Sequence, residues 1–120
     1  MMKLDMENTY YLVEYQQKLN ELYDNTVACP GSGCLIWLGA TSGDPTAGKT
    51  GRGYARTRWR GRKWQVSRLV VWLAKRLRGE KLWDWQQVDH KCRNRLCIRL
   101  EHLEPVTHKE NTKRRDKAKK

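Results

Sequence analysis

The chain has 120 residues, which allows a single domain with a modest hydrophobic core. Its 25 lysines and arginines outnumber 13 aspartates and glutamates, and the net charge of +12 favours a polyanionic partner. Residues 1–11 lack the apolar core of a secretion signal, and no apolar run is long enough to span a membrane. We therefore expect a cytoplasmic protein without a membrane partner; a phage-type protein acting inside a host cell would have the same features.

The first 28 residues differ in charge from the rest, with five acidic and two basic side chains. Within them, residues 7–24 are predicted to form a helix, because apolar side chains recur at helical spacing. This stripe consists of Leu12, Tyr15, Leu19 and Leu22. The acidic balance argues against direct contact with nucleic acid. We therefore divide the chain into a helical extension, residues 1–28, which packs or self-associates, and a main domain, residues 29–120.

A hairpin is predicted in the first half of the main domain. Residues 34–40 indicate a strand, and residues 41–53 a long loop rich in glycine, serine and threonine. Residues 54–59 and 63–66 then predict two strands, which the turn at residues 60–62 joins.

The charge of this hairpin suits DNA. From Lys49 to Lys63 there are seven basic residues and no acidic one. Alternate side chains of a strand share a face, so Tyr54 and the arginines at every second position after it can face a DNA groove while the other face packs. The basic end of the chain, residues 113–120, should follow phosphates. The candidate DNA contacts are Arg52, Arg56, Arg58, Arg60, Arg62, Lys63, Lys113, Arg114 and Arg115.

A helix is predicted over residues 67–78. Ser67 is placed to cap its start, and Gly79 should end it. Its apolar stripe consists of Leu69, Val70, Leu73 and Leu77.

Two strands and a final helix follow, with the strands at residues 86–90 and 103–106. Thr107 and Glu110 form a capping box, which predicts a helix that begins at about residue 108. Asn111 then lies in the first turn, where its amide oxygen suits a hard cation such as Mg²⁺; a solvated helix asparagine is the plain alternative.

A zinc site is indicated between the two strands. Cys92, Cys97 and His102 follow one another at equal spacing, and a structural zinc needs four such ligands in a tetrahedron. Cys34 is the preferred fourth ligand, because it adjoins a predicted strand, whereas Cys29 lies in a turn before proline and glycine.

Other uses of the cysteines remain open. Cys29 can replace Cys34 or His102, and an all-cysteine site would leave His102 without a metal. Two disulfides are a further alternative, which a reducing cytosol disfavours.

His90 lies two residues before Cys92 and outside the preferred ligand set. A neutral imidazole with an ordinary pKa near 6.5 can take a proton from water at physiological pH. The alternatives are an ordinary histidine at a strand end and a zinc ligand.

These residues resemble the HNH, or ββα-metal, nuclease superfamily, and above all its zinc-bearing homing-type endonucleases. The phrases that carry the resemblance are VDHKC, EHLEPVT and KEN, preceded by GCLIWLGA, GRGYAR and VSRLVVWLAKRLRG. The likeness covers residues 33–115, and the first 30 residues have no counterpart. The resemblance implies an α+β fold, in which a small antiparallel sheet or hairpin and a helix precede a zinc-stabilised ββα-metal motif.

The resemblance also implies roles. His90 would be the general base, Asn111 and Asp89 would bind a catalytic Mg²⁺ or Mn²⁺, and Arg56 is our choice for the arginine that stabilises charge on the phosphate. Cys34, Cys92, Cys97 and His102 would hold zinc. The chain departs from the family at Arg99-Leu100, where Asn-Pro is common, so that loop must be braced differently. His102 aligns with an asparagine of zinc-free relatives, so it could also orient His90.

We therefore expect a metal-dependent endonuclease of double-stranded DNA, either monomeric or homodimeric. The alternative from another class is a zinc-stabilised DNA-binding regulator, which needs the cysteines and the hairpin but has no use for His90 or Asn111. An RNA-binding module would need exposed aromatic side chains on the sheet, and Tyr54 is the evident candidate.

Overall fold

The computed structural model describes residues 6–42 and 53–118. The expected contact Arg52 lies outside these residues, and the side chain of Arg115 lies outside them too.

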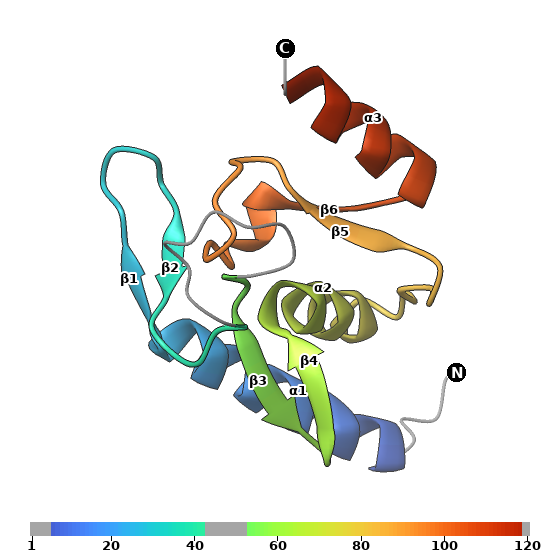
Figure 1. The fold of residues 1–120 in the computed structure, drawn as a ribbon. Coiled ribbons are helices and arrows are strands. Elements are labelled where there is room, and N and C mark those ends of the chain that lie inside the picture. Colours follow the sequence, from blue (N-terminus) through green and yellow to red (C-terminus); the bar gives the residue numbers. More distant parts are fainter. Residues whose placement is uncertain (1–5, 43–52, 119–120) are drawn as a thin grey trace.

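The described chain folds as α+β, with short antiparallel hairpins arranged around a central helix, as the sequence predicts (Figure 1). Helix α1 lies below the central helix α2, and the hairpins β3–β4 and β5–β6 lie on either side of α2. Helix α3 follows β6 and carries the chain away from the body. In chain order the elements are α1 (Met6–Asp24), β1 (Thr26–Ala28), β2 (Leu35–Trp37), β3 (Arg56–Trp59), β4 (Arg62–Gln65), α2 (Val66–Leu77), β5 (Gln87–His90), the 3₁₀ helix η1 (Leu100–His102), β6 (Leu103–Val106) and α3 (His108–Ala118).

Helix α2 is the centre of the hydrophobic core. Its apolar stripe is buried at Leu69, Val70 and Leu73, as the spacing predicts, and the left-handed Gly79 (φ 76°) follows its end. The start of α2 differs from the expectation. Gln65 occupies the N-cap position without a side-chain hydrogen bond, and Ser67 lies buried inside the first turn. Ser67 therefore does not cap the helix, because the strand β4 runs directly into it.

Helix α1 packs on the same core, through Tyr15, Leu19 and Leu22. Leu12, which the spacing assigns to the same stripe, is 39% exposed, so the buried face begins one turn later than expected. Tyr15 meets Trp72 of α2 edge to face, with ring centroids 5.2 Å apart. This aromatic contact attaches the acidic helix to the basic main domain.

The β3–β4 hairpin forms as predicted, with Arg58 opposite Lys63 and Trp59 opposite Arg62. Its tight turn consists of Arg60 (φ 53°) and Gly61 (φ 73°), both left-handed, which matches the right-handed twist of the strands. Burial alternates along β3 as the sequence predicts, with exposed arginines and a half-buried Thr57 between them.

A hairpin that the sequence did not predict joins β1 to β2. Val27 pairs with Ile36 and Ala28 with Leu35, in an antiparallel register. Only one strand, over residues 34–40, was expected, because a three-residue strand is too short for any sequence periodicity. Within the described residues, no helix is long and apolar enough to cross a membrane.

Arg60 connects the turn of the hairpin to α1. Its Nε and Nη2 atoms donate to the two carboxylate oxygens of Glu14, at 3.0 and 2.6 Å. The guanidinium also lies over three rings, those of Tyr11, Tyr15 and Trp59, between 4.6 and 5.4 Å from their centroids. Arg60 was expected to contact DNA. Its contacts instead assign it to the packing of the hairpin on α1.

We expect Arg60→Ala to destabilise the fold while Arg58→Ala does not. Each cation–π contact of an exposed arginine contributes about 0.5–1 kcal/mol, so Arg60→Ala should lower the free energy of unfolding by about 1 kcal/mol or more. Arg58 is exposed on the same strand and serves as the matched control. Urea denaturation measures both variants, and equal midpoints would contradict the structural role of Arg60.

Candidate functional site

Four potential metal ligands converge in the structure: Cys34, Cys92, Cys97 and His102. Their ligand atoms all lie within 4.8 Å of one another. The Nδ1 atom of His102 is 3.6 Å from the Sγ of Cys34 and 3.4 Å from the Sγ of Cys97. A thiolate and an imidazole bound to one tetrahedral zinc ion, at about 2.3 Å and about 2.0–2.1 Å, lie about 3.5 Å apart. The cluster therefore has the ligands and the spacing of a zinc site.

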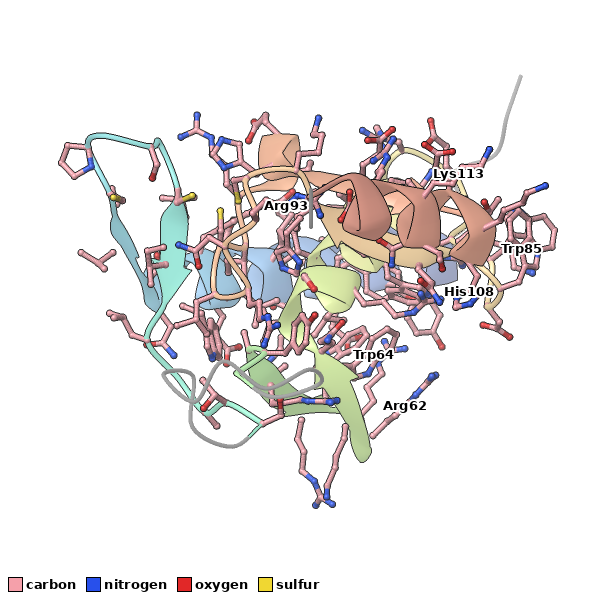
Figure 2. All side chains as sticks on the ribbon, turned by 45° about the horizontal axis from the view of Figure 1, so that its top comes forward. Arg62, Trp64, Trp85, Arg93, His108 and Lys113 are labelled. Atoms are coloured by element: carbon pink, nitrogen blue, oxygen red, sulfur yellow. The ribbon has the colours of Figure 1, made fainter. Side chains whose placement is uncertain are left out.

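Strand β2 brings Cys34 to the other three ligands. The Trp37 amide donates to the carbonyl of Leu96, at 2.8 Å, and the Ile98 amide donates to the carbonyl of Leu35, at 2.9 Å. These backbone bonds hold β2 beside the segment that contains Cys97. Figure 2 shows the sulfur atoms, in yellow, where the β1–β2 hairpin faces this loop.

Burial disfavours free thiolates at this cluster. Cys34 and Cys97 are 1% and 0% exposed, and burial raises the pKa of the Cys97 thiol to about 12. A bare thiolate is therefore unfavourable there, whereas metal binding displaces the proton. Cys29 is not a member of the cluster. Its amide donates to the carbonyl of Cys34, at 2.8 Å, so it closes the hairpin through its backbone.

Arg99 braces the loop where relatives commonly have asparagine. Its Nη1 donates to the carbonyl of Gly33, at 3.0 Å, and its Nε donates to Glu101, at 3.2 Å. Gly33 has a φ of 74°, a conformation that glycine adopts without strain. The arginine therefore ties the loop directly to the hairpin that carries Cys34.

A cleft of about 580 Å³ lies beside the cluster, and His90 is in its wall. His90 ends β5 and is 8% exposed. Within the described part of the chain, its Nε2 atom has no hydrogen-bond partner. Burial lowers the pKa of His90, which keeps the imidazole neutral at neutral pH. A neutral imidazole in the wall of a cleft can act as a general base toward a bound water.

Asn111 faces the same cleft from the first turn of α3. The turn forms as the capping box predicts, because the Glu110 amide donates to the Thr107 hydroxyl at 3.1 Å. The Nδ2 of Asn111 donates to Oε1 of Gln87, at 2.6 Å. With its nitrogen held in this way, the amide presents its oxygen as the atom that can bind a cation.

Sequence reasoning missed Gln87. This residue begins β5, and its Nε2 lies 2.8 Å from Nδ1 of His108, so it connects α3 at two points. Its position two residues before Asp89 put both side chains on one face of a strand, and that spacing was the available signal.

Asp89 also lines the cleft, and its carboxylate is bound by Arg114. The Nη1 of Arg114 lies 3.1 Å from Oδ2 of Asp89 and 2.8 Å from Oε2 of Glu104. Its Nε donates to Glu110, at 3.2 Å. Arg114 was expected to contact DNA phosphates. Its guanidinium binds three carboxylates, with which a DNA phosphate would have to compete.

The arginines of the cleft are Arg68, Arg93 and Arg95. Arg56, our choice from the sequence, does not line the cleft; it lines a second hollow between α1 and β3. The alternation of exposed and half-buried side chains along β3 correctly predicts that Arg56 is exposed. It does not predict which residues of the hairpin lie near His90.

Arg95 is the cleft arginine next to His90. Its guanidinium lies over the ring of Tyr54, 5.2 Å from the centroid, and that ring lies 6.1 Å from the ring of His90. The positive charge of Arg95 also lowers the pKa of His90. Arg68, by contrast, donates to the carbonyl groups of Trp83 and Gln86 and so holds the loop before β5.

Residues 69–113 match a family model described as HNH endonuclease. This match supports membership of the HNH superfamily for the segment that it covers. The HNH segment runs from α2 into α3, so it contains Asp89, His90 and Asn111 together with three members of the cluster, but it does not contain Cys34. Membership indicates nuclease-type activity. No curated protein and no solved structure matches the chain.

The cluster predicts a clear difference between two cysteines. Cys97→Ser should remove bound zinc and shift unfolding to much lower denaturant, because structural zinc contributes on the order of 10 kcal/mol to the folding of small zinc domains. Cys29→Ser, the matched control outside the cluster, should keep both the zinc and the unfolding midpoint. Elemental analysis and urea denaturation measure these effects. Zinc loss in Cys29→Ser with retention in Cys97→Ser would contradict the ligand set.

Proposed function

We propose that the protein is a homing-type HNH endonuclease that hydrolyses phosphodiester bonds of double-stranded DNA. The observation that carries the proposal is the cleft, which a buried histidine lines together with an aspartate and an asparagine. The family match over this segment supports it. The division into a helical extension, residues 1–28, and a nuclease domain, residues 29–120, belongs to the same proposal.

In the proposed reaction His90 is the general base. Its imidazole takes a proton from a water molecule, and the resulting hydroxide attacks the scissile phosphorus. The 3′ oxygen leaves, so the products carry a 5′ phosphate and a 3′ hydroxyl. The base needs no proton of its own at the start, which agrees with the lowered pKa of His90.

Asn111 and Asp89 would hold a Mg²⁺ or Mn²⁺ ion. Oxygen ligands of this kind are what hard divalent cations prefer, and both residues line the cleft with His90. When bound, such an ion supplies positive charge to the phosphate oxygens. Gln87 orients Asn111 for this task through the 2.6 Å hydrogen bond to its amide nitrogen.

The cluster of Cys34, Cys92, Cys97 and His102 would hold a structural zinc. It uses soft ligands and is closed by four protein groups, whereas the cleft offers hard oxygen ligands. Zinc would therefore bind at the cysteine cluster, and Mg²⁺ or Mn²⁺ would bind in the cleft. His90 lies immediately before the loop that contains Cys92 and Cys97. A zinc ion bound by that loop would therefore also fix the backbone of the general base.

Exposed basic side chains support a DNA contact. Arg56, Arg58, Arg62 and Lys63 are exposed on the β3–β4 hairpin, and Lys113 is exposed on α3. Figure 2 shows Arg62 beside Trp64, and its guanidinium lies 4.7 Å from the centroid of that ring. Phosphate contacts of this kind make binding strongly dependent on salt. Arg60 and Arg114 stay predicted DNA contacts, and each is bound to carboxylates in the structure.

His90→Ala should keep zinc and DNA binding but cut a supercoiled plasmid about 10²–10⁴-fold more slowly in Mg²⁺, because a positioned base contributes this factor. Asn111→Ala should also cut slowly but recover in part at high Mn²⁺, since it weakens binding of the divalent ion and leaves the general base intact. Arg78→Ala, the control, removes an exposed side chain at the end of α2 outside the cleft and should retain most activity. If wild type and His90→Ala cut equally, the base is wrong; if neither cuts with any divalent metal while both bind DNA tightly, the regulator is the better account.

A second pair of variants separates charge stabilisation from DNA binding. Arg95→Ala should slow single-turnover cleavage about 10²-fold with little change in affinity, because a donor at the developing charge is lost. Arg56→Ala should weaken binding and lower the salt slope by about one unit, as for one phosphate contact. Filter binding over a range of salt, with cleavage at saturating protein, measures both. The reverse pattern would restore Arg56 as the arginine that acts on the phosphate.

A further inference from the structure

A second hollow, of about 430 Å³, lies between helix α1 and strand β3. Among the described residues that line it, three are basic and one is acidic: Lys18, Arg56, Arg58 and Glu21. The two arginines are two positions apart on β3, so their side chains leave the strand on the same side. The lysine comes from α1. Positive charge therefore reaches this hollow from two elements that are far apart in the sequence.

Hydrogen bonds hold the walls of the hollow together. The Leu38 amide donates to the carbonyl of Asn25, at 3.0 Å, which joins the end of α1 to the segment after β2. The carbonyl of Ala40 accepts from the amide of Arg56 and from Nε1 of Trp37, each at 2.9 Å, which joins the same segment to β3. Asn25, Trp37, Ala40 and Arg56 all line the hollow, so these bonds fix its shape.

Lys18 is the basic residue that the sequence did not assign to a partner. Its side chain is 12% exposed, and its Nζ lies 3.3 Å from Oε1 of Glu21, whose side chain is 70% exposed. An ion pair with so exposed a carboxylate contributes little to stability, because water and salt screen it. Glu21 can therefore give up the lysine to an anion that the two arginines attract as well.

The chemistry of the hollow suits a phosphate group. Each guanidinium can donate two parallel hydrogen bonds to phosphate oxygens, and the lysine adds a compact positive charge. A water molecule takes about 30 Å³ in the liquid, so 430 Å³ has room for a phosphate with part of its sugar.

The hollow also continues the cleft that contains His90. Tyr54 lines the cleft and Arg56 lines the hollow, and residues two positions apart in an extended segment are roughly 7 Å apart. One strand of DNA presents a phosphate about every 3.4 Å along the duplex axis. A duplex whose scissile phosphate occupies the cleft therefore has further phosphates at the distance of the hollow.

We propose that the hollow between α1 and β3 binds a backbone phosphate of the DNA duplex, and that Lys18 binds this phosphate together with Arg56 and Arg58. Glu21 holds Lys18 in the free protein and releases it when the phosphate enters. The acidic helix α1 is then part of the DNA interface, contrary to what its charge balance indicates. The proposal rests on the proposed function for the identity of the substrate, but it concerns binding and not cleavage.

The test measures duplex binding by the full-length, zinc-loaded protein without added Mg²⁺ or Mn²⁺, over a range of salt. Lys18→Gln should bind about fivefold to tenfold more weakly at 0.1 M salt, with a salt slope lower by about one unit, as for one phosphate contact. Glu21→Gln should bind about threefold more tightly, because the carboxylate that competes with the phosphate is gone. Lys18→Arg keeps the charge and should bind as wild type does.

A second ion pair supplies the matched controls. Lys75 of α2 is 18% exposed and pairs with Glu80, at 3.5 Å, outside both hollows. Lys75→Gln and Glu80→Gln make the same changes of net charge, and both should leave the affinity and the salt slope unchanged. The double variant Lys18→Gln/Arg56→Ala should lose less affinity than the two single losses multiplied together, because both side chains bind one phosphate.

The source of the phosphate is tested with inorganic phosphate, titrated into the wild type and Lys18→Gln at constant ionic strength. Phosphate that binds tightly through Lys18, while duplex binding is the same in both proteins, would assign the hollow to a small phosphate compound and overturn the DNA contact. Weak phosphate binding with the expected loss of duplex binding supports the proposal.

The remaining outcomes are equally decisive. Equal duplex binding by wild type and Lys18→Gln, or an equal loss in Lys75→Gln, would refute a contact at the hollow. If Lys18→Gln does not fold, Glu21→Gln decides, since binding no tighter than wild type would contradict the exchange of partners. A wild type that binds no duplex refutes the proposal. A wild type that binds in the expected order but cuts no DNA refutes the nuclease function and leaves the phosphate site standing.

Discussion

The contact between Cys34 and His102 joins parts of the chain that are 68 residues apart, and the rest of the site depends on it. One ligand comes from the β1–β2 hairpin and three come from the loop between β5 and β6. A short chain with a small core gains stability from such a cross-link. Because β5 leads straight into this loop, a zinc ion held by these ligands would also fix the backbone at His90 in the wall of the cleft.

Around the cleft, two polar networks extend this rigidity. Gln87 joins Asn111 to His108, and Arg114 joins Asp89 to both β6 and α3. The groups that would bind an ion are thus held from behind by partners that do not themselves reach the proposed substrate. This arrangement gives Arg114 of helix α3 a structural role that the sequence does not show, because its carboxylate partners on β5 and β6 lie elsewhere in the chain.

The sequence predicts local features well and side-chain partners poorly. Strand β6 and the capped start of α3 follow from the Thr107–Glu110 box, and the ligand choice between Cys29 and Cys34 follows from the turn that contains Cys29. Long-range pairing is different. The sequence around Arg60 does not indicate its pairing with Glu14, and the sequence around Arg114 does not indicate its pairing with Asp89. From the sequence, both arginines were therefore predicted only as DNA contacts.

X-ray absorption at the zinc edge of the purified, full-length protein tests the central claim most directly, because it reports the ligands of the metal that organises the site. We expect three sulfur atoms at about 2.3 Å and one nitrogen at about 2.0–2.1 Å, with the multiple-scattering signal of a single imidazole. A spectrum of four sulfur atoms would contradict the account, since Cys29 would then replace His102. A protein that is folded and contains no zinc would contradict it as well.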